Sequence, residues 1–399
     1  MINPSAPGWI AKYFTKQKLS DQALAMSTDL FYQKIRNTGF IYGHIASFET
    51  TATIETEGWV QNELPKVALL STLYTLYGIT TQDNSPENFT QKAISFYNEM
   101  NPQGFNIFKK VLPNGAPSLN LEKMIDDRVQ TNIDIISKNF SHIVTNALLF
   151  IDVLAFRQYL LHGSIPEKYL KKIEESVLSL VSLALKTKSQ KTNYDDLLIK
   201  LFEASVRYSK FSKVSVQNLE EMQLGYFQSD LEKYYMIDMA GMAMWSDGKI
   251  ENEEAYFLYK LAEIVEINDT FVQESIQNTD HFIRTNKKEI PYFNYSNPVK
   301  HFYDQTTQSV ITLISRNKNR LVKEIIQSKE LVLLLAYSTR RDLDEKEKKK
   351  VKKQLLDICK TIPSLTIFLL PGGSLLLPIL IKFIPKLLPS AFNENLEDQ

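Results

Sequence analysis

Residues 143–161 read IVTNALLFIDVLAFRQYLL and form the most apolar stretch in the body of the chain. Their apolar side chains recur with helical spacing, which predicts an α-helix. Asn146, Asp152 and Arg157 interrupt the stretch, whereas a bilayer-spanning helix needs about twenty mostly uncharged residues. We therefore interpret it as a buried helix of a soluble domain. It ends a long helical stretch, 119–161, that we expect to be broken once.

Signals for the start of a helix recur along the first half of the chain. Ser85-Pro86-Glu87 combines an N-cap, a proline at the first helical position and an acid in the first turn. Pro166 is expected to open another helix that ends near Lys186. Its predicted apolar face carries Val177, Leu180, Leu183 and Leu185. Glycine is sparse, 13 in 399 residues, and hairpin signals are nearly absent. The predicted fold class is all-α, with a helical N-terminal domain over 1–225.

Composition and motifs argue against several classes of function. Lys plus Arg and Asp plus Glu both number 46, so no overall charge favours nucleic acid. The single cysteine, Cys359, excludes an intramolecular disulfide framework. The sequence holds no P-loop, GxGxxG, nucleophile elbow or HExxH, and its histidines lack ligand spacing. We therefore predict that the protein is not an enzyme.

Three acids after residue 125, Asp126, Asp127 and Asp134, could share one helix face. Such a group could bind a metal or exchange protons. A solvated face is the commoner arrangement, because carboxylates are mostly exposed.

A second informative segment follows at 226–295. An apolar helix with an internal acid, Asp238, is expected to carry Tyr235, Met239, Met242 and Met244 toward a core. It leads into the pattern A-x-x-x-D-G-x-I-x-x-E-E at 243–254. This pattern resembles the TerB-like domain of tellurite-resistance proteins.

The TerB-like resemblance implies a weak divalent-cation site. Its acids match Asp238, Asp247, Glu251 and Glu254 in this chain. The alternative is a purely structural turn, because Asp-Gly is ordinary chemistry at a helix end. An EF-hand is excluded, because Gly248 stands at position two of the loop and Leu258 at position twelve.

The C-terminal part contains a run with no charged residue, IPSLTIFLLPGGSLLLPILI, at 362–381. Its length suits a bilayer crossing. Prolines break it at 363, 371 and 378, beside Gly372 and Gly373, and a soluble core helix would rarely tolerate that spacing. We predict a broken membrane segment over 361–392, which spans, re-enters or folds back.

The residues after this run carry a recognisable signature, F-x-P-x-x-L-P-S-x-F. Together with Pro363, Pro371, Gly372, Gly373 and Pro378, the signature resembles the Letm family of transmembrane proteins. Its residues here are Phe383, Pro385, Leu388, Pro389, Ser390 and Phe392. Gly372, Gly373 and Ser374 stand where eukaryotic members carry a Glu beside the central proline. Combined with the TerB-like segment, the pattern is similar to bacterial Letm-related proteins described as biofilm-associated.

Basic residues flank the apolar run on its N-terminal side. Residues 340–353 hold eight Lys or Arg against four Asp or Glu. The predicted juxtamembrane residues are Arg340, Arg341, Lys348, Lys349, Lys350, Lys352 and Lys353. Basic residues so placed stay cytoplasmic and attract anionic headgroups. Because residues 1–17 lack the apolar core of a signal peptide, we expect the protein on the cytoplasmic side of a bacterial inner membrane.

Five parts are therefore predicted. They are an N-terminal helical domain (1–225), a TerB-like segment (226–295), a helical connector with the basic helix (296–360), a Letm-like membrane segment (361–392) and an acidic tail (393–399). The predicted function is a non-enzymatic, membrane-associated scaffold or regulator. Two alternatives stay open: a component of cation or proton homeostasis, and a soluble helical protein whose tail packs on itself or on a partner. Expected partners are an anionic membrane leaflet, other proteins or a second copy. Nucleic acid is not expected, nor is the ribosome, because the chain ends soon after Phe392.

Overall fold

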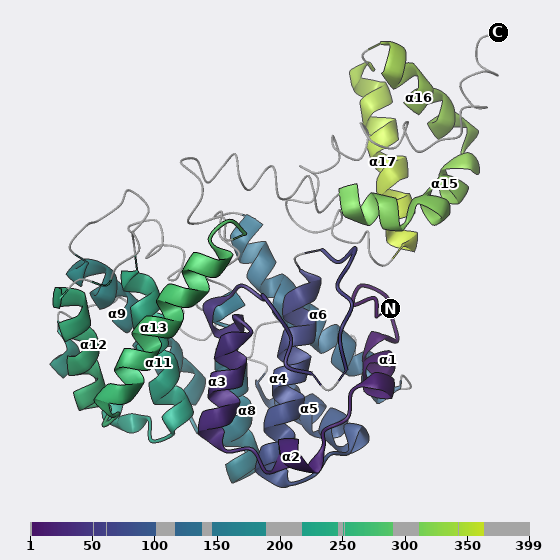
Figure 1. Ribbon diagram of the computed structural model, residues 1–399. Helices are drawn as coiled ribbons and strands as arrows, with labels where there is room; N and C mark the ends of the chain where they lie inside the picture. Colours follow the sequence, from purple (N-terminus) through teal and green to yellow (C-terminus); the bar gives the residue numbers. More distant parts are fainter. Residues whose placement is uncertain are drawn as a thin grey trace. The chain divides into compact units, whose positions relative to one another are not determined.

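The computed structural model shows a helical protein (Figure 1). It describes residues 2–50, 52–60, 62–100, 116–137, 146–188, 218–245, 250, 252–289, 311–341 and 343–362. Within these ranges every regular element is a helix and none is a strand. The all-α prediction is confirmed for this part of the chain.

The chain divides into two compact units. The first contains Met1–Ile2, Gly8–Glu55 and Leu64–Ser296. The second contains Asn3–Pro7, Thr56–Glu63 and Asn297–Gln399. Two short N-terminal segments thus belong with the C-terminal unit, and residues 226–295, the predicted TerB-like segment, belong to the same unit as the helices before them.

The first unit is built from helices and short 3-10 turns. Its α-helices are α1 (Trp9–Lys16), α2 (Asp21–Leu24), α3 (Thr28–Asn37), α4 (Glu63–Thr81), α5 (Pro86–Met100), α6 (Pro117–Ser137), α8 (Phe150–His162), α9 (Tyr169–Thr187), α11 (Asp230–Met244), α12 (Asn252–Ile264) and α13 (Asp269–Asn286). The first residue of α4, Glu63, belongs to the second unit. Its 3-10 helices are η1 (Phe40–Tyr42), η3 (Leu219–Glu221) and η4 (Leu224–Tyr226).

Helix α11 lies at the centre of one half of this unit and contacts α3, α9, α12 and α13. Tyr235, Met239 and Met244 are buried, as predicted, and Met242 is half-buried. The helix begins with a capping box in which Ser229 and Glu232 satisfy each other's backbone amides. Neighbouring helices therefore cover α11 on several sides.

The apolar stretch at 143–161 contributes α8, which is a buried helix as predicted. Asp152 is fully buried on it and accepts two hydrogen bonds from Arg128 of α6, one from Nε at 2.7 Å. This pairing explains how a carboxylate is tolerated among apolar neighbours. Among the described residues, a turn at 148–149 interrupts the stretch 119–161 directly before α8. Residues 138–145 lie outside the described part of the chain.

Two other predicted helix starts have different outcomes. The Ser85 hydroxyl accepts the amide of Asn88 at 3.2 Å, which confirms the start of α5. The helix expected from Pro166 begins later, at Tyr169. Lys168 has a φ of 63°, a left-handed conformation that a right-handed helix cannot include. The apolar face predicted for this helix is buried, as expected.

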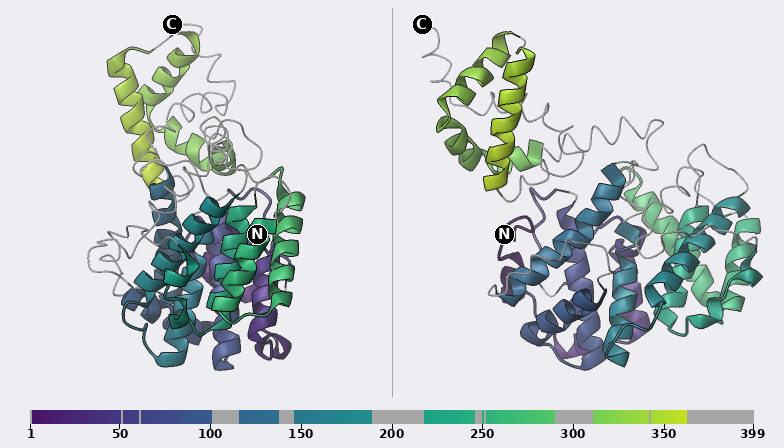
Figure 2. Two further views of the ribbon diagram at one scale, coloured as in Figure 1. Left: turned by 90° about the vertical axis from the view of Figure 1, so that its left-hand side faces the viewer. Right: turned by 180° about the vertical axis from the view of Figure 1, so that it is seen from behind.

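The second unit contains a small helical bundle, drawn in yellow-green in Figure 2. Its helices are α15 (Lys318–Ile326), α16 (Lys329–Arg340) and α17 (Glu345–Thr361). Their inner faces enclose Leu321, Ile325, Leu331, Leu335, Val351, Leu355, Cys359 and Ile362, with Val60 from the N-terminal segment. Burial raises the pKa of the Cys359 thiol to about 12.

Among the described residues, no helix is both long and apolar enough to cross a membrane. Of the predicted membrane segment, 361–392, Thr361 ends α17 and Ile362 is buried in the core of the second unit. Residues 363–392 lie outside the described residues, as does the acidic tail after them.

Candidate functional site

Asp238, the first predicted metal ligand, lies in a buried polar network joining α3, α11 and α13. Tyr32 Oη donates to its Oδ2 at 2.6 Å, and Ser275 Oγ donates to its Oδ1 at 2.5 Å. Arg36 Nη1 lies 3.7 Å from Oδ2. Burial raises the pKa of Asp238, while Arg36, Ser275 and Tyr32 oppose that rise. Both carboxylate oxygens are therefore already engaged.

This arrangement suits a structural role for Asp238 better than metal coordination. A guanidinium beside the carboxylate would repel a cation, and the two donated hydrogen bonds occupy the oxygens. Glu254 is buried on α12, whereas Asp247 and Glu251 lie outside the described residues. Where side chains are described, no three His, Cys, Asp or Glu residues are grouped to hold a metal ion. The four-acid site as a whole stays a prediction.

The acids of α6 do more than face solvent. Asp126 Oδ1 lies 2.8 Å from Lys66 Nζ, and Asp127 is half-buried. Glu122, one turn earlier, accepts the amides of Gly8 and Ile10, each at 2.9 Å. It caps α1, whose own N-cap, Gly8, has no side chain to do so. The side chain of Asp134 is not described.

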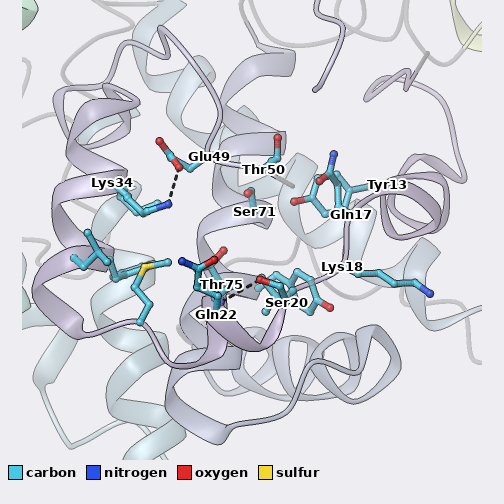
Figure 3. A pocket seen from close by; sticks show the side chains of 17 residues that line it. Tyr13, Gln17, Lys18, Ser20, Gln22, Lys34, Glu49, Thr50, Ser71 and Thr75 are labelled. Atoms are coloured by element: carbon cyan, nitrogen blue, oxygen red, sulfur yellow. Dashed lines mark hydrogen bonds and ion pairs between the residues drawn. The ribbon is translucent and has the colours of Figure 1, made fainter. Parts of the chain in front are cut away.

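A pocket of about 250 Å³ opens between α1, α2, α3, α4 and residues 49–50 (Figure 3). Phe31, Ile35 and Leu19 contribute apolar surface. At its polar side, Lys34 Nζ pairs with Glu49 Oε2 at 3.2 Å. Sequence reasoning did not find this pocket, because its residues come from separate segments between positions 13 and 75.

The polar groups of the pocket mostly hold the surrounding loops in place. Gln17 donates to the carbonyl of Ala52 at 2.6 Å and accepts its amide at 3.0 Å. Tyr74 Oη donates to the carbonyl of Asn84 at 2.5 Å, and Ser20 caps α2. No histidine or cysteine is present among the described residues of its wall. The pocket therefore offers space for a small molecule beside these structural contacts.

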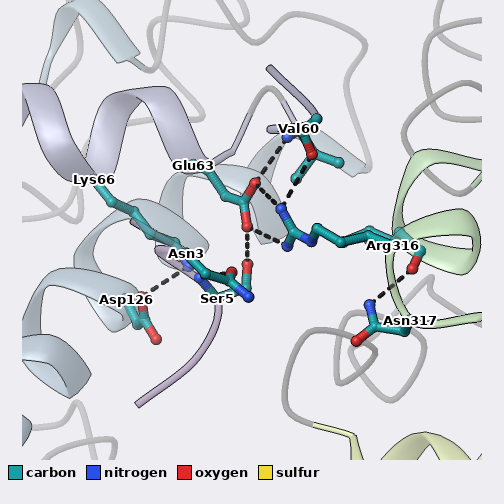
Figure 4. Close-up of polar contacts among 10 residues, drawn as sticks. Asn3, Ser5, Val60, Glu63, Lys66, Asp126, Arg316 and Asn317 are labelled. Atoms are coloured by element: carbon teal, nitrogen blue, oxygen red, sulfur yellow. Dashed lines mark hydrogen bonds and ion pairs between the residues drawn. The ribbon is translucent and has the colours of Figure 1, made fainter. Parts of the chain in front are cut away.

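A buried ion pair forms the polar centre of the second unit (Figure 4). Arg316 donates to both carboxylate oxygens of Glu63, at 2.6 and 2.9 Å. Ser5 Oγ donates to Glu63 Oε1 at 2.5 Å, and the Val60 amide donates to Oε2 at 2.9 Å. Burial alone would raise the pKa of Glu63, but these hydrogen bonds outweigh it and lower the pKa. Sequence reasoning missed this cluster, because Arg316 lies 253 positions and Ser5 lies 58 positions from Glu63.

Helix α17 carries the five lysines among the predicted basic residues. Asp344 caps it by accepting the amides of Lys346 and Glu347, each at 2.8 Å. Val351, Leu355 and Cys359 form its buried face. Its exposed surface carries Lys346, Lys348, Lys349, Lys350, Lys352, Lys353 and Lys360.

Some of these charges are paired. Lys350 contacts Glu330 at 2.7 Å, and Lys360 contacts Asp357 at 2.6 Å. Arg341, just before α17, pairs with Glu347 at 2.6 Å. Only the backbone of Arg340 is described. The structure thus gathers the predicted lysines on the outer surface of one helix.

Comparison with known proteins relates this helix to a family. Residues 343–399 match the family model described as LETM1-like, RBD. The C-terminal part of the chain is Letm-like. The match begins beside the cap of α17 and includes the uncharged run and the closing signature. No curated protein and no solved structure matches the chain. The TerB-like resemblance and the biofilm-associated type stay predictions.

Proposed function

We propose that this Letm-related protein is a non-enzymatic scaffold or regulator, held at the cytoplasmic side of a bacterial inner membrane by its C-terminal part. The observation that carries the proposal is the exposed basic surface of α17, directly followed in the sequence by the uncharged run 362–381. Both lie within the LETM1-like match.

Two attractions of different range would hold the protein at the membrane. Lysines near an anionic leaflet contribute about 1 kcal/mol each, and salt screens this term within about 10 Å at 0.1 M. Burial of the apolar run contributes about 25 cal/mol per Å² and is insensitive to salt. The apolar run should therefore supply the lasting attachment, while α17 orients the protein at the surface.

Truncation provides the test. Ile362 is buried in the core of the second unit, so a stop codon placed after it preserves that core. We expect this truncation to move the protein from the membrane pellet to the soluble fraction. Any residual binding through α17 should be released by 0.5 M salt.

A matched truncation after Phe392 removes only the acidic tail and should leave the protein in the pellet. Unchanged partitioning after truncation at Ile362 would overturn the proposed attachment. It would favour the alternative in which the C-terminal part packs on a protein.

A further inference from the structure

Helix α16 exposes two large apolar side chains. Leu333 is 39% exposed and Tyr337, one turn later, is 43% exposed. Their neighbours Leu331, Val332, Leu334 and Leu335 are buried. Exposed apolar residues one turn apart make a continuous ridge along a helix, whereas scattered ones need no explanation.

Polar contacts fix which side of α17 lies beside this ridge. At one end, Lys350 and Gln354 both bond to Glu330, at 2.7 and 2.8 Å. At the other end, Arg341 donates twice to Glu347, at 2.6 and 2.8 Å. We call these five residues the α16–α17 seam.

The seam lies on the same side of α16 as the apolar ridge. Glu330 and Tyr337 are seven residues apart, which is two helical turns, so they share a face. The Arg341 guanidinium also lies 5.4 Å from the centre of the Tyr337 ring. The ridge therefore borders the seam along its length.

Across the seam, α17 presents exposed positive charge. Lys346, Lys349 and Lys353 recur at helical spacing beside Lys350, so they share one side of α17. All three are exposed, and none forms a salt bridge with a described residue. The seam acids, Glu330 and Glu347, are both already paired.

We infer that this surface, the α16–α17 face made of Leu333, Tyr337, Lys346, Lys349 and Lys353, lies against an anionic lipid surface. The inference rests on the proposed function and deepens it. Lysines match anionic headgroups, and an exposed tyrosine beside an aliphatic side chain suits the boundary between headgroups and acyl chains. Continuity supports the same occupant, because α17 leads directly into the uncharged run.

Photo-crosslinking in the full chain tests the contact directly. A benzophenone side chain would replace Tyr337 or, as a matched control, Tyr256 of α12, which is 68% exposed. With vesicles of phosphatidylglycerol and phosphatidylethanolamine, we expect at least fivefold more lipid adduct at position 337 than at 256. With phosphatidylcholine vesicles, that excess should disappear.

The outcomes separate the two proposals. Vesicle-bound protein with equal adducts at both positions would overturn the α16–α17 face and leave the proposed function standing. Crosslinking of position 337 to a protein in native membranes would likewise overturn it. Protein that binds neither vesicle would overturn both.

Vesicle binding by substituted variants provides a second test of the α16–α17 face. Leu333→Asn should weaken partitioning onto anionic vesicles several-fold. Leu161→Asn, at a 51% exposed leucine of α8, should leave partitioning unchanged. Equal effects of the two substitutions would contradict the inference, provided that both variants keep the parent's helical content.

Discussion

Asp127 of α6 shows how a single residue can set a pH dependence. Burial, reinforced by Asp126, raises its pKa to about 6, and Lys123 opposes the rise. Because the folded pKa exceeds the unfolded one, the protonated form stabilises the fold. That contribution is complete below about pH 4 and is lost as the pH rises through 6.

Substitution of Asp127 by asparagine removes this titration. We expect Asp127→Asn to be more stable than the parent at pH 7.5, by roughly 1 to 2 kcal/mol after allowing for solvent screening, and nearly equal at pH 4. Thermal melts at the two pH values measure the difference. Asp126→Asn breaks the ion pair with Lys66 and should lower the melting temperature at pH 7.5. A stability gap for Asp127→Asn that does not change with pH would contradict the assignment.

Among the elements, α17 depends on its first turn. Its N-terminus is closed by a capping box in which Asp344 and Glu347 satisfy each other's backbone amides. The three buried residues of the helix, Val351, Leu355 and Cys359, then complete the core of the second unit. The cap therefore supports the surface that carries the lysines.

Loss of this cap has a measurable cost. Asp344→Ala should destabilise the second unit by about 1 kcal/mol, because two amides lose their acceptor. Denaturant unfolding followed by circular dichroism gives the change. Asp357→Ala, at an exposed residue on the same helix, removes only a surface ion pair and should stay within about 0.5 kcal/mol of the parent. Indistinguishable losses in the two variants would mean that the cap is not the stabilising feature.

In the whole molecule, neither unit is one continuous stretch of the chain. Residues 3–7 and 56–63 belong to the same unit as α15, α16 and α17. Glu63 ties them together through Ser5, Val60 and Arg316. A C-terminal fragment that starts at 297 would therefore lack part of its own unit.

Breaking the ion pair should loosen the second unit selectively. Arg316→Met leaves the fully buried Glu63 without its cation, and such losses cost about 3 to 5 kcal/mol. We expect hydrogen exchange in peptides of α15 and α17 to become at least tenfold faster, while peptides of α11 keep their rates. Arg320→Met, which among the described residues loses a bond from the exposed Arg320 to the Thr361 carbonyl, is the control. Faster exchange in α11 as well would show that the units do not open separately.

The sequence alone was enough to predict the helical class, the buried helix that became α8 and the Letm-like relation of the C-terminal part. Each of these depends on local spacing or on a contiguous motif. It also identified Asp238 as unusual, although not its partners.

The other features depend on the tertiary fold, because contacts between distant residues leave no local signal in the sequence. Only the fold shows that Asp238 bonds to Tyr32 and Ser275, and that Glu63 meets Arg316. In α16, residues 331–337 are an unbroken run of apolar or aromatic residues, so their pattern cannot distinguish a buried leucine from Leu333. Packing against α15 and α17 buries one side of that helix and leaves Leu333 and Tyr337 exposed.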